Sequence, residues 1–127
     1  MLSKSRVPGW NWLLQRVTAI LLAVGLLGHF LVLHYSRLFS KETLTAPAST
    51  AWRFASSPIF WMVFDGLLLA AGLYHAFNGA YNIICDYNPK PCTRKALAWT
   101  LWIVGFAAFG LGLAILGRFI GFSLGKV

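Results

Sequence analysis

The amino-acid sequence predicts an all-α membrane protein with three transmembrane helices. Of its 127 residues, 58% are hydrophobic and 11% are charged, and three long apolar runs extend over about residues 12–35, 59–85 and 96–120. A bilayer core of roughly 30 Å requires about 20 helical residues, so each run is long enough to cross it. The connections are too short for a soluble domain, so residues 1–127 are predicted to form a single transmembrane anchor domain.

The first run is introduced by the stretch SKSRVPGWNW at residues 3–12. Pro8 and Gly9 interrupt regular structure, and Trp10 and Trp12 suit the membrane interface. This stretch is predicted to be a short interfacial segment before the helix enters the membrane. The run itself is too long for a signal-peptide core and no small-residue cleavage site follows it, so we expect a retained span.

The second and third runs are predicted to form a helical hairpin. Residues 36–58 read as an outer loop, after which Pro58 suits the first turn of the second helix. Pro89 and Pro91 cannot continue that helix, and Thr93 is a candidate cap for the third helix.

The net charge of +8 does not indicate nucleic-acid binding, because the basic residues are spread along the chain and no basic helix interleaved with aromatic residues is present. Six of them fall on one predicted side of the membrane (Lys4, Arg6, Arg16, Lys90, Arg94 and Lys95) and five on the other (Arg37, Lys41, Arg53, Arg118 and Lys126). This bias favours a cytoplasmic N-terminus and a cytoplasmic 86–95 loop. Cys85 and Cys92 lie on the same side and match no metal-site spacing, so they are predicted to be structural thiols.

A stripe of small and polar residues is predicted along the second helix. His75 and Asp86 are eleven residues apart, which is about 16 Å along a helix and only about 20° around it. Gly79 and Asn82 fall on the same stripe. One side of this helix therefore runs as a polar track from the middle of the membrane to its cytoplasmic edge.

His75 is predicted to lie near the centre of the bilayer, where a polar side chain is costly and by default functional. The plainer interpretation is a histidine hydrogen-bonded to a neighbouring helix. The sharper one is an axial ligand of a haem iron, which requires a neutral imidazole in a dry site and room for the macrocycle. Gly72 and Gly79, one turn on either side, would supply that room.

A second axial ligand from within this chain is not expected. The remaining histidines are His29, about 20 Å beyond Arg16 along the first helix, and His34, about 27 Å beyond it. Neither matches the depth of His75, so the partner ligand is predicted to come from another subunit. His29 could serve a second, outer haem or satisfy a polar contact, and His34 is expected at the headgroups. Asp65 is expected at the outer interface without a function.

Asp86 and Tyr87 are placed where the headgroup of a lipid-soluble quinone would meet the cytoplasmic edge of the membrane. Quinone reduction takes two electrons and two protons, so its site requires hydrogen-bond donors to the carbonyl oxygens and a carboxylate route for protons. A tyrosine and an aspartate supply both functions. The alternative is that the pair merely ends a helix at the interface.

Two stretches carry a family resemblance: WLLQRVTAI at 12–20 and HAFNGAYNIICDY at 75–87. They resemble the membrane-anchor subunits of succinate dehydrogenase (respiratory complex II), most closely the small hydrophobic anchor that accompanies the cytochrome b subunit. The family pattern is an arginine followed by a small or hydroxyl residue in the first span, then a histidine, a glycine and an Asp-Tyr pair in the second. Its elements here are Arg16, Thr18, His75, Gly79, Asp86 and Tyr87.

The resemblance implies that His75 is one axial ligand of a haem b shared with a companion cytochrome b subunit. Tyr87 would bind an oxygen of the substrate quinone, with Asp86 beside it, and Arg16 would lie level with the quinone and the haem propionates. A flavoprotein and an iron–sulfur subunit would oxidise succinate to fumarate, so this chain would carry no catalytic residue for that step. The implied location is the bacterial cytoplasmic (inner) membrane, in contact with lipid and not with nucleic acid.

Several alternatives stay open at this point. The small hydrophobic anchors of this family commonly lack a histidine in the first span, whereas two-haem relatives carry one. His29 therefore leaves open the number of haems, and the choice between the small anchor and the cytochrome b subunit stays open too. The chain could also be a haem-free structural anchor, or a cytochrome b subunit of another quinone-linked dehydrogenase. Subunits of that last class usually have more histidines and more spans. The sequence does not distinguish ubiquinone from menaquinone, or succinate oxidation from fumarate reduction.

Overall fold

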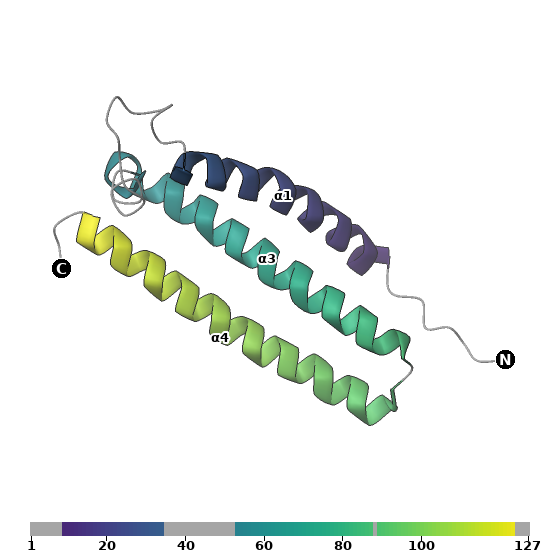
Figure 1. Cartoon of the computed structure of the whole chain (residues 1–127). Coiled ribbons are helices and arrows are strands. Elements are labelled where there is room, and N and C mark those ends of the chain that lie inside the picture. The colour runs from purple at the N-terminus through teal and green to yellow at the C-terminus, as the bar shows by residue number, and fades with distance from the viewer. Residues whose placement is uncertain (1–8, 35–52, 88, 124–127) are drawn as a thin grey trace.

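A computed structural model of the chain describes residues 9–34, 53–87 and 89–123. Three long helices make up almost all of this part: α1 (Gly9–His34), α3 (Pro58–Asp86) and α4 (Pro91–Ser123) (Figure 1). Each is long and apolar enough to cross a membrane. The predicted all-α fold with three transmembrane helices is confirmed. The interfacial segment and the outer loop fall largely on residues 1–8 and 35–52, which lie outside the described residues.

Two boundaries differ from the predictions. Helix α1 begins at Gly9, so Trp10 and Trp12 lie in its first turns and not in a separate surface segment. Helix α4 begins at Pro91, so Thr93 is inside the helix and is not its cap. Proline is well suited to the first helical position because its fixed φ is helical and the N–H that it lacks would have no partner there. The first bond of α4 runs from the Arg94 N–H to the Lys90 carbonyl at 3.1 Å.

Helix α3 lies between the other two and packs against both (Figure 1). Its N-terminus is formed as expected, with a proline in the first turn and the Trp61 N–H donating to the Ser57 carbonyl at 3.1 Å. The short link after Asp86 returns the chain as α4, which confirms the α3–α4 hairpin. In the described part of the chain only Thr18, Arg53 and Phe54 are buried. The remaining surface of the spans is available to lipid and to partner helices.

Glycines let the helices approach closely. A Cβ atom built on Gly25 of α1 would lie 2.7 Å from Leu68 Cδ1 of α3, and one built on Gly112 of α4 would overlap Leu69 of α3. In a membrane, helices are held together by packing and hydrogen bonds, because lipid is as apolar as the side chains that they bury. These two leucines therefore fill hollows that only glycine leaves open.

The hollow at Gly112 can be tested against Gly110, which lies on the same helix with nothing within 4 Å of the position its Cβ would take. We expect Gly112→Ile to lower the free energy of unfolding by about 1–3 kcal/mol, the usual cost of overpacking. Gly110→Ile introduces the same side chain into the same helix and is expected to cost less. Thermal unfolding in detergent, followed by circular dichroism, measures both. Equal losses in the two variants would show that the α3–α4 contact does not depend on this hollow.

Candidate functional site

His75 lies on the side of α3 that faces α1. Its Nδ1 atom is 3.2 Å from the Thr18 hydroxyl oxygen of α1. A Cβ at Gly72 would be 3.7 Å from Leu22 Cδ2, and one at Gly79 would be 3.2 Å from Gln15 Nε2, both side chains of α1. The stripe predicted from the sequence is thus part of the surface along which the two helices pack.

The room that the sequence assigned to a macrocycle at Gly72 and Gly79 is taken by α1, so that expectation was wrong. The small residues on this stripe permit close helix packing, which a single helix sequence cannot distinguish from space left for a flat ligand. A haem held by His75 must therefore lie away from these two glycines.

Two carboxamides that sequence reasoning passed over complete the contact between α1 and α3. The Gln15 side-chain amide donates to the His75 carbonyl at 3.1 Å, and the Asn78 amide donates to Gln15 Oε1 at 2.7 Å. Carboxamides inside apolar spans usually bond across helices, and this was the signal that could have identified them. They hold the backbone of α3 at the turn that carries the histidine.

The donor set at this point fits a haem. Among the described residues no three His, Cys, Asp or Glu side chains gather to hold a bare metal ion. The porphyrin of a haem supplies four nitrogen ligands to the iron, so this chain needs to contribute only one imidazole. With Nδ1 of His75 beside Thr18, the second ring nitrogen, Nε2, is the atom left for iron.

The predicted quinone residues lie at the C-terminal end of α3. Tyr87 caps the helix, with its N–H 3.2 Å from the Ile84 carbonyl, and is 85% exposed. Asp86, just before it, is also exposed. Arg16 stacks its guanidinium over the Trp12 ring at 4.9 Å. None of the three shares a contact with His75 in the described part of the chain, so any site that joins them needs further groups.

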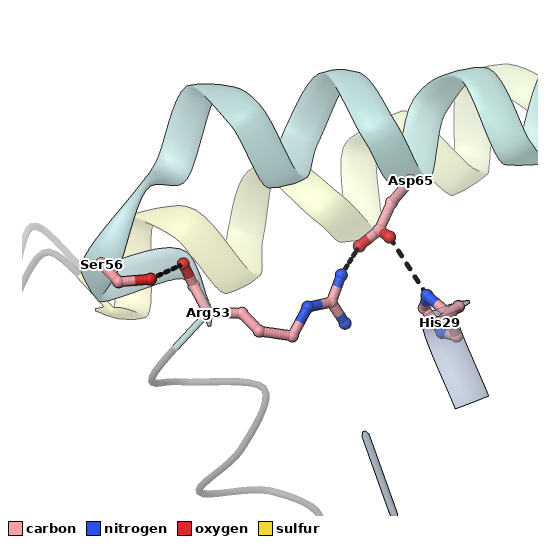
Figure 2. Close-up of polar contacts among 4 residues, drawn as sticks. All are labelled: His29, Arg53, Ser56 and Asp65. Atoms are coloured by element: carbon pink, nitrogen blue, oxygen red, sulfur yellow. Dashed lines mark hydrogen bonds and ion pairs between the residues drawn. The ribbon is translucent and has the colours of Figure 1, made fainter. Parts of the chain in front are cut away.

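An ion cluster made of His29, Arg53 and Asp65 lies toward the C-terminal end of α1 and the N-terminal end of α3 (Figure 2). Arg53 donates to one carboxylate oxygen of Asp65 at 2.5 Å. Nδ1 of His29 lies 3.2 Å from the other oxygen, but it is not aligned for a hydrogen bond. The side chains of Arg53 and Asp65 are only 2% and 9% exposed. Asp65 was expected at the outer interface without a function, and the structure adds that its carboxylate lies between His29 and Arg53.

Aromatic rings surround the arginine of this cluster. Its guanidinium carbon lies 4.2 Å from the centre of the Trp61 ring and 5.6 Å from that of Phe54. The Ser56 hydroxyl donates to the Arg53 carbonyl at 2.9 Å and supports the turn (Figure 2). Sequence reasoning counted Arg53 among the interfacial charges. Its partners, Asp65 and the rings of Trp61 and Phe54, come together through the folding of 53–56 onto α3, which charge counting along the sequence does not predict.

A groove runs along α3 on the side bordered by the start of α1 and by α4. Its volume is about 530 Å³, and aromatic side chains line it, among them Tyr74, Phe77, Tyr81, Trp102 and Phe106. The Tyr74 hydroxyl oxygen is buried and has no hydrogen-bond partner in the part of the chain that the structure describes. An unpaired hydroxyl is costly in an apolar medium. The groove is a mainly apolar, aromatic-lined face of α3 and α4.

Comparison with known proteins adds a finding that these contacts cannot supply. Residues 1–117 match the family described as the succinate dehydrogenase/fumarate reductase transmembrane subunit. The chain belongs to this family. The anchor is also 30% identical, over 114 residues, to the succinate dehydrogenase hydrophobic membrane anchor subunit of Archaeoglobus fulgidus, a match that covers 90% of this chain and 92% of that relative. No solved structure matches it.

The resemblance noted from the sequence is thereby confirmed: the protein is a membrane anchor of the succinate dehydrogenase class, a multi-pass component of an oxidoreductase complex. Its two cysteines are free thiols, Cys85 half-buried and Cys92 exposed.

The ion cluster of the anchor gives a stability prediction. Asp65→Leu leaves the Arg53 charge buried without a partner, and we expect the free energy of unfolding to fall by about 3–5 kcal/mol. The double variant Arg53→Met, Asp65→Leu removes both charges and is expected to regain most of this loss. Thermal unfolding of the purified protein compares the three forms. A double variant no more stable than Asp65→Leu would contradict charge pairing as the reason that Asp65 matters.

Proposed function

We propose that this anchor binds haem b through His75 and forms part of a quinone-reduction site with Asp86 and Tyr87. The observation that carries the proposal is the placement of His75: a histidine inside a transmembrane helix, with Nδ1 beside a hydroxyl and Nε2 left for a ligand, in a chain of the succinate dehydrogenase anchor family. Haem, when bound, supplies a one-electron redox centre close to the quinone.

The second axial ligand is assigned to a companion cytochrome b subunit. Helix α1 has no histidine at the depth of His75, since His29 lies beside Asp65, further toward the outer side. The aromatic-lined groove along α3 and α4 is a face on which a partner helix could pack. The complex would also contain an iron–sulfur subunit and a flavoprotein subunit, with the electrons of succinate reaching the quinone through the former. His29 remains a candidate ligand of a second haem.

At the inner membrane edge, the exposed Tyr87 hydroxyl is suited to donate a hydrogen bond to a quinone carbonyl oxygen. Asp86 beside it can accept protons from the aqueous phase and pass them on, since each quinone takes up two protons with two electrons. Arg16, exposed on α1, is assigned to an anionic group at the same level, a haem propionate or the reduced quinone. The proposed location is the bacterial cytoplasmic membrane, with the N-terminus and the 86–95 loop on the cytoplasmic side, as the distribution of basic residues favours.

Haem content tests the proposed ligand. We expect His75→Ala, purified as the whole complex, to lose one haem b from the reduced-minus-oxidised spectrum, because iron loses its only protein ligand from this subunit. An unchanged haem-to-protein ratio would identify a haem-free anchor instead. The matched variant is His29→Ala: a ratio that also falls there would assign a second haem to His29, and an unchanged ratio would leave His29 to the ion cluster alone.

The quinone site has its own test. Tyr87→Phe removes one hydrogen-bond donor worth about 1.4 kcal/mol, so we expect quinone reduction by succinate to slow by about tenfold. Reduction of an artificial dye by the soluble subunits is expected to persist. Thr100→Val, which also removes one exposed hydroxyl, on α4, is the control and should leave quinone reduction near its original rate. Equal loss of quinone and dye reduction in Tyr87→Phe would argue against this role.

A further inference from the structure

Thr18 is one of the three buried residues of the described chain, and its hydroxyl lies between the backbone of α1 and the imidazole of α3. Its oxygen is 2.7 Å from the Leu14 carbonyl, 3.2 Å from the Gln15 carbonyl and 3.2 Å from Nδ1 of His75. The hydroxyl has one hydrogen to donate and two lone pairs to accept with. How these are distributed determines the protonation of the ring.

Both backbone partners are carbonyl oxygens, which can only accept. An imidazole nitrogen without a proton could accept the hydroxyl hydrogen as well, but the Leu14 carbonyl is the nearest acceptor, at 2.7 Å against 3.2 Å for Nδ1, and this distance assigns the hydrogen to Leu14. The lone pairs that remain face His75, so the ring can bond to this oxygen only by donating from Nδ1. A neutral imidazole carries one N–H, which leaves Nε2 with a free lone pair.

We propose that Thr18 is a positioning residue that holds His75 in the Nδ1–H tautomer and so presents Nε2 as the ligand atom. This rests on the proposed haem ligation by His75. The opposite tautomer would put the proton on the atom that must bind iron. Gln15 supports the arrangement from the same helix, since its amide bonds to the His75 carbonyl. Gly79, where a Cβ would press on that amide at 3.2 Å, keeps the space for it.

The hydrogen bond also affects the electronic properties of the ligand. A metal-bound histidine that donates its other N–H to an oxygen becomes more basic. A more basic ligand stabilises ferric over ferrous iron, so the bond with Thr18 lowers the midpoint potential of the haem. Removing it should raise that potential, and a tenfold change in the relative affinity for the two iron states corresponds to about 59 mV for one electron.

The test compares three variants in the purified, haem-containing complex. Thr18→Val keeps the branched shape and removes the hydroxyl, and Thr18→Ser keeps the hydroxyl and removes the methyl group. Thr100→Val is the matched control, because the Thr100 hydroxyl makes the same kind of bond to the Ala96 carbonyl, at 3.0 Å, on an exposed side of α4. Spectroscopic redox titration gives the midpoint potential of each.

We expect a rise in potential of the order of 59 mV in Thr18→Val, equivalent to tenfold in relative affinity, and values close to the original protein in Thr18→Ser and Thr100→Val. An unchanged potential in Thr18→Val, or an equal rise in Thr18→Ser, overturns the proposal. If Thr18→Val fails to assemble, Thr18→Ala takes its place in the redox titration: a rise in potential that Thr18→Ser does not show supports the proposal, and an unchanged potential overturns it.

Failure of this inference is distinct from failure of the proposed function. If His75→Ala retains its haem, the proposed haem ligation by His75 is wrong. If His75→Ala loses its haem and Thr18→Val has an unchanged potential, the proposed ligation by His75 is supported and only the proposed role of Thr18 is wrong.

Discussion

No hydrophobic force draws one helix against another inside a bilayer, so the contact between α1 and α3 depends on close packing and on hydrogen bonds across the helices. The rest of the structure follows from this contact. Gly25 receives Leu68, Gly79 admits Gln15, and the side chains of Gln15 and Thr18 then reach the turn of α3 that carries His75. A longer side chain at Gly79 would displace the amide that holds this turn.

Two polar clusters therefore join the same pair of helices at different depths, and they differ in chemistry. One, around His75, is built from neutral groups: the Thr18 hydroxyl lies against the imidazole, the Gln15 amide donates to the His75 backbone carbonyl, and the Asn78 amide donates to Gln15. The other pairs a carboxylate with a guanidinium that is 2% exposed, and it ties the turn at 53–56 to the bundle. The first cluster is held by hydrogen bonds between neutral groups, whereas the buried charges of the second stabilise each other only as a set.

The sequence was a good guide wherever the physics is local. Three apolar runs longer than the bilayer is thick, broken by Pro58, Pro89 and Pro91, predicted three spans and a hairpin, and the structure has both. Helical periodicity placed His75 and Gly79 on one stripe, and both do face the same neighbour. The prediction that Thr93 caps the third helix was wrong, because Pro91 is already the first residue of α4. The predicted and observed helix starts differ by only two residues.

What the sequence by itself determined is therefore the number of spans, their approximate ends and the residues that share a helical face, because these follow from hydrophobic length and from the 100° turn of the helix. Only the tertiary structure decided which helix that face meets. It placed α1 where a macrocycle was expected at Gly72 and Gly79, set Thr18 against His75, and enclosed Asp65 between His29 and Arg53. Each of these contacts joins residues far apart in the chain, and periodicity within one helix carries no information about its neighbour.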